Sequence, residues 1–301
     1  MRIHPDVAAA CEAGRPVVAL ESTIISHGLP RPRNLQAARD FEEILRKRDV
    51  VPATIAVLDG EPHVGLDDAA LERIALDDSV VKVSVRDLPV AMATRTSGAT
   101  TVAATAFLAA RAGIRVFSTG GLGGVHRGAS ATFDESADLT TLAGTRITVV
   151  SAGVKSILDI PATLERLETL GVTVLGYGTD QFPSFWLTES GETLDWAVPD
   201  AATVAAVMAA NDALGRESAV LVANPLPSGK QLDPRVHDEA LRQALAEAER
   251  DAITGKDVSP YLLARIVELT HGSSLEVNLD IAANNITVGA EIATAWSARD
   301  R

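Results

Sequence analysis

Short apolar runs alternate with longer amphipathic stretches along most of this chain. Short apolar runs bounded by polar and turn-forming residues are typical of buried strands. We expect strands at residues 17–20, 53–58, 82–85, 116–119, 147–152, 172–177 and 219–223. Apolar residues at helical spacing predict helices at residues 34–47, 100–112, 163–170, 202–214 and 234–250, and residues 260–296 are expected to be helical nearly throughout.

Several residues mark the ends of these elements. Asn34 is well placed as the N-cap of the first long helix, because its side chain can accept a hydrogen bond from a free N–H of the first turn. Gly113 closes the helix that starts at residue 100. Asp59 and Gly60 predict a hairpin turn that leads into a short strand at residues 63–65.

The order of the elements predicts the fold class. Strands separated by helices imply a mainly parallel central sheet with helices on both faces, which is an α/β/α architecture. No linker rich in Pro, Gly or Ser divides the chain, so we expect a single α/β domain over residues 1–301. Sheets of this kind bind ligands where strands end and helices begin, so reactive residues are expected just after the apolar runs.

The amino-acid composition indicates which kinds of molecule the protein can bind. The chain is 47% apolar and 22% charged, which indicates a packed core rather than disorder. It has 27 Lys+Arg and 40 Asp+Glu, a formal net charge of −13, and a surface that negative repels a phosphate backbone. We therefore expect no nucleic-acid polymer as partner, whereas a small anionic molecule fits a recessed pocket lined by a few cations.

The cysteine count and the distribution of apolar residues indicate the cellular compartment of the protein. Cys11 is the only cysteine in the sequence, which excludes an internal disulfide and a zinc site of the CxxC type. Residues 1–20 lack the apolar stretch of a secretory signal, and no segment approaches the ~20 apolar residues of a membrane span. We expect a cytoplasmic protein with no membrane partner.

An acidic residue directly ends the first predicted strand. Glu21 follows residues 17–20 and precedes Ser22 and Thr23. A partly desolvated carboxyl at the ligand-facing edge of a sheet has a raised pKa, which suits proton transfer. The alternative is a strand-end glutamate that only accepts hydrogen bonds from turn N–H groups, with Ser22 and Thr23 as caps.

Residues 98–102 have the composition of a phosphate seat. Small and hydroxyl residues at a helix start offer free N–H donors and the positive end of the helix dipole. Thr101 and Val102 lie in this segment, and Lys82 on the preceding strand could add a full charge. Simple helix capping is the alternative.

Residues 119–128 hold five glycines directly after a strand. Glycine lets a backbone approach a ligand closely, or lets a loop move as a lid. The spacing matches neither a dinucleotide-binding fingerprint nor a Walker loop. A flexible loop without chemistry is the alternative.

Asp134 and Asp138 are four residues apart, on one helical face or around a turn. Hard oxygen ligands suit Mg²⁺ or Mn²⁺ rather than zinc or copper. Two solvated surface charges are the alternative.

Lys155 lies just beyond the apolar run at residues 147–152, among small residues. A poorly solvated lysine gives up its proton more readily, and the free amine can attack a carbonyl carbon. The alternative is a lysine that extends its ammonium group into solvent.

Eight motifs occur in order along the chain, among them ESTIISHG, GGLGGVHR and AGVKSILD. They lie at residues 21–28, 51–56, 86–89, 98–103, 120–127, 134–138, 152–159 and 222–225. Together they resemble the pseudouridine-5′-phosphate glycosidase family, also called pseudouridylate synthase or indigoidine-synthase-A-like. The resemblance runs from about residue 17 to about residue 292, nearly the whole chain.

The resemblance implies a glycosidase, of the lyase type, that reversibly cleaves the C–C glycosidic bond of pseudouridine 5′-phosphate to uracil and ribose 5-phosphate. It implies Mn²⁺, or another divalent cation such as Mg²⁺, as cofactor and a homotrimer as assembly. Lys155 would form an imine (a Schiff base) with the sugar and Glu21 would donate a proton. Asp134 would bind the metal, and the substrate would contact Lys82, Thr101, Val102, Ser136, Ala137 and Asp138, with His126 and Asn278 near the base.

The leaving group in this reaction is a carbon atom of the base. A pair of carboxylates is sufficient to cleave glycosides with an oxygen or nitrogen leaving group, but a carbon leaving group needs a lysine that forms an imine. One rival is a C-ribosyl synthase of the same family that joins ribose 5-phosphate to a different aromatic acceptor. A second is a non-catalytic nucleotide-binding protein, which the presence of both Glu21 and Lys155 disfavours.

Overall fold

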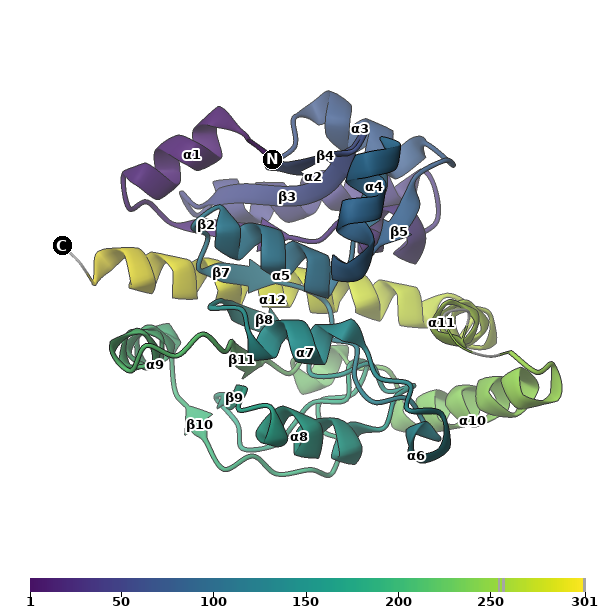
Figure 1. The fold of residues 1–301 in the computed structure, drawn as a ribbon. Coiled ribbons are helices and arrows are strands. Elements are labelled where there is room, and N and C mark those ends of the chain that lie inside the picture. Colours follow the sequence, from purple (N-terminus) through teal and green to yellow (C-terminus); the bar gives the residue numbers. More distant parts are fainter. Residues whose placement is uncertain (254, 256–257, 300–301) are drawn as a thin grey trace.

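The computed structural model describes residues 1–253, 255 and 258–299 (Figure 1). Within these residues the strands form one 11-stranded sheet, whose main path runs β1-β4-β3-β2-β7-β8-β11-β9-β10. β5 and β6 branch from β3. The strands are β1 (Arg2–Ile3), β2 (Val17–Leu20), β3 (Val51–Leu58), β4 (Glu61–Val64), β5 (Val81–Val83), β6 (Gly98–Thr100), β7 (Val116–Ser118), β8 (Thr148–Ser151), β9 (Thr173–Tyr177), β10 (Ala197–Val198) and β11 (Val220–Ala223).

All ladders from β3 through β2, β7, β8, β11 and β9 to β10 are parallel, which confirms the predicted sheet type. The predicted hairpin is also confirmed, because β3 and β4 pair antiparallel with Leu58 opposite Glu61. Its two turn residues, Asp59 and Gly60, have φ of 50° and 81°. A two-residue turn with positive φ at both positions matches the twist of the strands that it joins.

Helices cover both faces of the sheet, as predicted. α2, α9 and α12 pack together on one face, and α1, α5, α7 and α8 lie on the other (Figure 1). The helices are α1 (Pro5–Glu12), α2 (Arg33–Arg46), α3 (Asp68–Leu76), α4 (Leu88–Thr94), α5 (Val102–Arg111), α6 (Ala129–Thr132), α7 (Ala137–Ala143), α8 (Ile160–Thr169), α9 (Ala201–Ala213), α10 (Pro234–Arg250), α11 (Val258–Leu269) and α12 (Ser273–Ala298). None of the described helices is long and apolar enough to cross a membrane.

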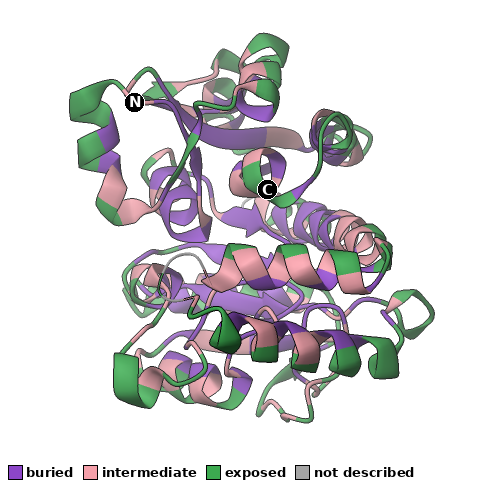
Figure 2. Ribbon diagram, turned by 90° about the vertical axis from the view of Figure 1, so that its right-hand side faces the viewer, coloured by how far each residue is buried: buried purple, intermediate pink, exposed green. Residues whose placement is uncertain are grey.

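The core has a layer on each face of the sheet, because successive strand residues point to opposite faces. Val17 and Ala19 of β2 join the layer under α5, whereas Val18 and Leu20 join the layer under α12. Figure 2 shows the central strands buried and the exposed residues on the outer sides of the helices. A sheet buried on both faces explains why its strands are continuous apolar runs.

The structure corrects several expected boundaries. Asn34 is not the N-cap: α2 begins one residue earlier, and the buried Asn34 side chain donates to the carbonyl oxygens of Ile25 (2.9 Å) and Ala75 (2.7 Å). Residues 98–100 form a strand, so the following helix begins at Val102. The C-terminal helical stretch is broken at His271 and Gly272, whose φ values are 50° and 84°.

Candidate active site

The two predicted reactive residues, Glu21 and Lys155, and one further residue, Thr119, lie at the carboxyl ends of three neighbouring strands. Glu21 directly follows β2, Thr119 directly follows β7, and Lys155 lies in the turn after β8. The parallel register sets Leu20 beside Ser118, so the next residues along, Glu21 and Thr119, are also neighbours. The Thr119 hydroxyl donates a hydrogen bond to Glu21 Oε1.

Burial raises the pKa of the Glu21 carboxyl above its usual range, and the nearby Asp138 carboxylate raises it further. Lys155, the Thr119 hydroxyl and Lys82 act in the opposite direction, but burial is the largest effect. The residue as a whole is partly exposed. The raised pKa predicted from the sequence is therefore confirmed, and Glu21 is suited to hold a proton and donate it.

Lys155 is partly buried and sits in a tight turn beside the glycine-rich loop. The backbone N–H of Lys155 donates to the carbonyl oxygen of Leu122 (3.2 Å). Gly153 starts the turn with φ of 71°, and a Cβ there would lie 2.2 Å from the carbonyl oxygen of Pro183, so only glycine fits. The Lys155 charge acts on the pKa of both Glu21 and Lys82, so the three groups lie close enough to interact electrostatically.

Lys82 on β5 brings a second cation to this site. Its pKa is lowered by burial and by Lys155, while Asp138 and Glu21 act in the opposite direction. The residue as a whole is exposed, so an anionic ligand can reach its side chain. His27, in the π-helical turn η1 (Ile24–Gly28), faces the same cation, and burial and Lys82 lower its pKa.

The start of α5 has fewer free donors than residues 98–102 predict. The N–H of Ala103 donates to Asp138 Oδ1 (2.9 Å), and the N–H of Ala104 donates to the Thr101 hydroxyl (3.4 Å). The N–H of Val102 has no acceptor among the described residues. One N–H at a helix start thus remains for a phosphate oxygen, and Thr101 serves as the N-cap.

Asp138 links two segments of the site. It is 6% exposed, and its second carboxylate oxygen accepts from the N–H of Gly123 (2.8 Å). It therefore ties the start of α5 to the glycine-rich loop. The idea that Asp134 and Asp138 share a helical face is wrong, because α7 begins at Ala137 with Ser136 as its N-cap and Asp134 lies before it.

The donors near Asp134 suit a hard divalent cation. Asp134 Oδ2 lies 3.8 Å from His126 Nδ1, and the His126 N–H donates to the Asp134 carbonyl oxygen (3.0 Å). Over the described ranges no cluster of three or more His, Cys, Asp or Glu residues could hold a metal ion. A cation here would take one or two protein ligands and fill its remaining positions with water and substrate oxygens, an arrangement typical of Mg²⁺-type ions.

The glycine-rich loop is closely packed. A Cβ at Gly123 would lie 2.3 Å from Ser136 Oγ, and a Cβ at Gly124 would lie 2.4 Å from Thr163 Oγ1. The Asn285 amide of α12 donates to the carbonyl oxygens of Thr119 (2.8 Å) and Gly120 (3.1 Å). These glycines therefore permit close backbone packing and do not form an open lid.

Sequence reasoning missed two of these residues. It left Asn285 as a polar residue on a helix face, yet its side chain is buried and holds the loop beside Glu21. The sequence feature that could have identified Asn285 is an amide side chain within the otherwise apolar C-terminal helix. Thr119 was noticed only as the end of a strand. Asn278 Oδ1 is buried without a hydrogen-bond donor and would lie 3.5 Å from a Cβ at Gly120, so it points toward the site.

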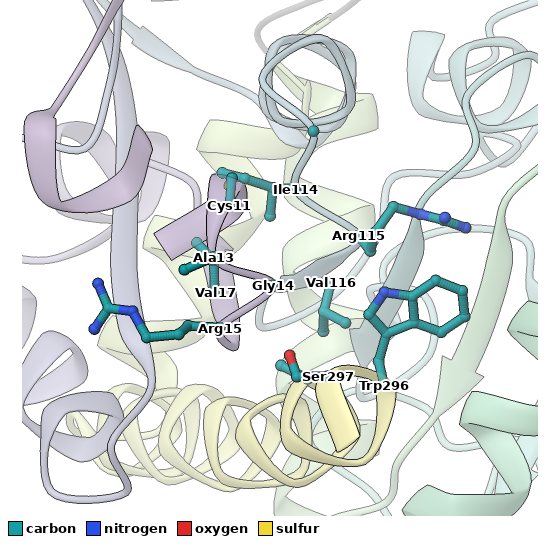
Figure 3. A pocket seen from close by; sticks show the side chains of 12 residues that line it. Cys11, Ala13, Gly14, Arg15, Val17, Ile114, Arg115, Val116, Trp296 and Ser297 are labelled. Carbon is teal, nitrogen blue, oxygen red and sulfur yellow. The ribbon is translucent and has the colours of Figure 1, made fainter. Parts of the chain in front are cut away.

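Two cavities differ in whether the predicted site residues line them. A pocket of about 20 Å³ is lined by Glu21, Thr119 and Gly120. A larger cavity of about 200 Å³ lies at the opposite, amino-terminal ends of β2 and β7, beside the end of α12 (Figure 3). It is lined by Cys11, Arg15, Arg115 and Trp296, among others, and by none of the predicted site residues. The small pocket includes Glu21 but none of the other predicted site residues. We place the candidate active site at the carboxyl ends of β2, β7 and β8, where Glu21, Thr119 and Lys155 lie.

A lysine near a carboxyl of raised pKa, with a second cation and a free helix N–H, defines a class of α/β enzyme suited to carbonyl chemistry on a phosphorylated ligand. The model of the family described as "Indigoidine synthase A like protein" matches residues 6–295. The chain belongs to this family.

Relatives and solved structures agree over nearly the full length. The chain is 63% identical to the pseudouridine-5′-phosphate glycosidase of Frankia alni over 97% of this chain and 81% of that protein. It is 59% identical to the protein of the same name from Saccharopolyspora erythraea over 98% and 97%. Among structures, the prealnumycin C-glycosynthase AlnA, solved in complex with ribulose 5-phosphate, gives a TM-score of 0.92 at 36% identity over 99% and 97% of the two chains. An indigoidine synthase A-like protein from Thermotoga maritima gives 0.87 at 35% identity over 95% and 94%.

Proposed function

We propose that this protein is a pseudouridine-5′-phosphate glycosidase, an enzyme that reversibly cleaves pseudouridine 5′-phosphate to uracil and ribose 5-phosphate. The observation that carries the proposal is that Glu21 and Lys155 follow β2 and β8 at the same end of the parallel sheet, with Lys82 on β5 close enough to affect the pKa of Glu21. Relatives of this name at 63% and 59% identity support the choice of substrate.

The reaction follows from the positions of the two reactive groups. Glu21 donates a proton to the ring oxygen as the C1′–O4′ bond of the ribose breaks. The Lys155 amine then bonds to C1′ and gives up a proton to the Glu21 carboxylate, which passes a proton to C5 of the base. The nitrogen lone pair forms a C=N bond while the C1′–C5 bond breaks, and its electron pair stays with uracil. Water hydrolyses the imine, which releases ribose 5-phosphate and the free amine.

The phosphate holds the substrate in place while these bonds change. The Lys82 ammonium and the free N–H of Val102 are the donors that we assign to it. An anion at a helix start gains from both the N–H group and the dipole. Binding energy from the phosphate is remote from the reacting bond and orients the sugar toward Lys155.

The remaining assignments come from the family resemblance and form part of the proposal. Asp134 would hold Mn²⁺ or Mg²⁺, which supplies charge stabilisation when bound. His126, whose Nδ1 lies 3.8 Å from Asp134 Oδ2, would lie near the base together with Asn278. Ser136, Ala137 and Asp138 would contact the substrate. A homotrimer and a cytoplasmic location complete the proposal.

The main alternative is a C-glycosynthase that uses a different aromatic acceptor, which the likeness to AlnA favours. The identity to AlnA is 36%, against 63% to a glycosidase, so we place the alternative second. Incubation with uracil, ribose 5-phosphate and Mn²⁺, followed by liquid chromatography, separates the two. Pseudouridine 5′-phosphate is the expected product. Its absence, with ribose 5-phosphate still trapped on the protein by borohydride, would favour the alternative.

The covalent step has its own test. Borohydride reduction in the presence of ribose 5-phosphate, followed by peptide mass mapping, is expected to place the label on Lys155. Label on another residue, or unchanged turnover in Lys155→Ala, would contradict the role of this amine.

A further inference from the structure

The residue that follows Lys155 makes a buried contact with a distant helix. Ser156 is 3% exposed, and its Oγ lies 2.8 Å from His237 Nε2. His237 is also 3% exposed and belongs to α10, an element distant from this turn in the sequence. The turn that carries the proposed nucleophile is therefore anchored to a separate element.

The hydrogen-bond direction follows from the groups around the ring. His237 Nδ1 lies 3.0 Å from Asp238 Oδ1, and a carboxylate only accepts hydrogen bonds. Nδ1 therefore carries a proton, and in the tautomer with the proton on Nδ1 alone Nε2 accepts from the Ser156 hydroxyl. The tilted ring of Trp186, with its centroid 6.1 Å from that of His237, packs on the same histidine.

The order Ser–His–Asp is that of a hydrolase triad, but the burial of Ser156 argues against a nucleophilic serine. Its hydroxyl is enclosed between the turn and α10, so no substrate carbonyl can reach it. The hydrogen bond between Ser156 and His237 can instead fix the conformation of the turn. A side chain fixed by a buried hydrogen bond orients the backbone of its neighbour, which here is Lys155.

The other contacts of this turn come from the glycine-rich loop. The Lys155 N–H donates to Leu122 in the glycine-rich loop (3.2 Å). The Arg127 guanidinium donates to the carbonyl oxygens of Ser156 (3.3 Å) and Ile157 (3.2 Å). The His237 contact is shorter than these and is made from α10, so the turn is held between two elements.

We propose that His237 is a positioning residue for Lys155, acting through the Ser156 hydroxyl. The inference rests on the proposed role of Lys155. Without the hydrogen bond the turn gains freedom, and the amine spends less time aligned with C1′. Because the phosphate site does not involve this turn, sugar binding is retained while the chemical step slows.

The test compares Ser156→Ala, His237→Leu and His237→Gln. Glutamine can place an acceptor near the position of Nε2, whereas leucine cannot. We expect kcat to fall about two- to tenfold in Ser156→Ala and His237→Leu, the range that follows from the loss of one neutral hydrogen bond. The KM for pseudouridine 5′-phosphate should stay within about twofold, and His237→Gln should recover most of the rate. Combining Ser156→Ala with His237→Leu should cost no more than the larger single effect.

A second readout does not depend on the reaction. Acetic anhydride labels free amines, and mass mapping gives the labelling rate of Lys155 relative to the exposed Lys230. We expect this ratio to change in Ser156→Ala and His237→Leu and to return in His237→Gln. Arg235→Leu, an exposed change on the same helix, is the matched control and should leave both readouts unaltered.

The outcomes separate the two proposals. A wild-type protein with no turnover and no borohydride adduct contradicts the proposed function, while the labelling ratio still decides the positioning role. Unchanged kcat and labelling in Ser156→Ala and His237→Leu, with only a lower melting temperature, would overturn the positioning role. If His237→Leu does not fold, Ser156→Ala removes the same hydrogen bond with a smaller change and decides the question.

Discussion

The hydroxyl of Thr119 donates a hydrogen bond to the Glu21 carboxyl across neighbouring strands β7 and β2. This contact stabilises the ionised form of Glu21, whereas burial and Asp138 favour the protonated form. The proton affinity of the proposed acid is therefore a balance that one side chain can shift. The same contact also directs the carboxyl within the pocket that both residues line.

Replacing Thr119 by valine is expected to raise the pKa of Glu21 further, because a hydrogen bond to the charged form is lost. If Glu21 acts as a proton donor, activity falls as pH rises through its pKa, so the alkaline limb should move to higher pH. The maximal rate should fall about tenfold or more because the carboxyl loses its orientation. The pH profile of kcat/KM measures both effects.

Thr119→Ser is the control, since it keeps the hydroxyl and removes only a methyl group. Its profile should lie close to that of the wild type. An alkaline limb that moves to lower pH in Thr119→Val, or that does not move at all, would show that Glu21 is not the group that titrates.

Lys82→Gln should weaken phosphate binding. Loss of a hydrogen bond from a charged donor costs about 1.5–3 kcal/mol, so the KM for pseudouridine 5′-phosphate should rise about ten- to 150-fold. Inhibition by inorganic phosphate should weaken in parallel. Lys230→Gln, which removes an exposed lysine paired with Asp280, serves as the control. An unchanged KM would remove Lys82 from the phosphate site.

Gly123→Ala should disrupt the contact between the glycine-rich loop and α7. The new Cβ would lie 2.3 Å from Ser136 Oγ and 2.9 Å from Asp138 Oδ2, so the loop must shift away. We expect a loss of stability of about 1–3 kcal/mol together with lower activity, because Asp138 also holds the start of α5. Chemical denaturation measures the first effect. Gly144→Ala, where no atom lies within 4 Å of the new Cβ, should leave stability nearly unchanged, and equal losses in the two variants would refute the packing argument.

Asp134→Asn should reduce metal affinity without unfolding the protein, because the side chain is partly exposed and lies outside α7. Calorimetric titration of the wild type with Mn²⁺ is expected to show binding that the variant lacks or shows at least tenfold more weakly. Glu165→Gln on the outer surface is a charge-matched control. Equal Mn²⁺ affinity in Asp134→Asn and wild type would place the cation elsewhere.

Local patterns in the chain were sufficient for the central strands β2, β3, β7, β8, β9 and β11, the hairpin at Asp59 and Gly60, and the position of Glu21 and Lys155 just after apolar runs. Each of these depends on residues close together in sequence: burial sets the run of apolar residues, and turn geometry requires particular backbone angles. The raised pKa of Glu21 could be anticipated for the same reason, since the edge of a buried parallel sheet is a desolvated place.

Only the tertiary structure decided which side chains meet. The sheet order sets Thr119 beside Glu21, and the packing of α12 brings the Asn285 amide to the glycine-rich loop. The Asp138 carboxylate accepts hydrogen bonds from two backbone segments, the start of α5 and the glycine-rich loop. Asn34 does not cap a helix; its side chain links the turn after β2 to α3. These contacts join residues far apart along the chain. A local pattern encodes how deeply a residue is buried, but the identity of its neighbour depends on how strands and helices pack together.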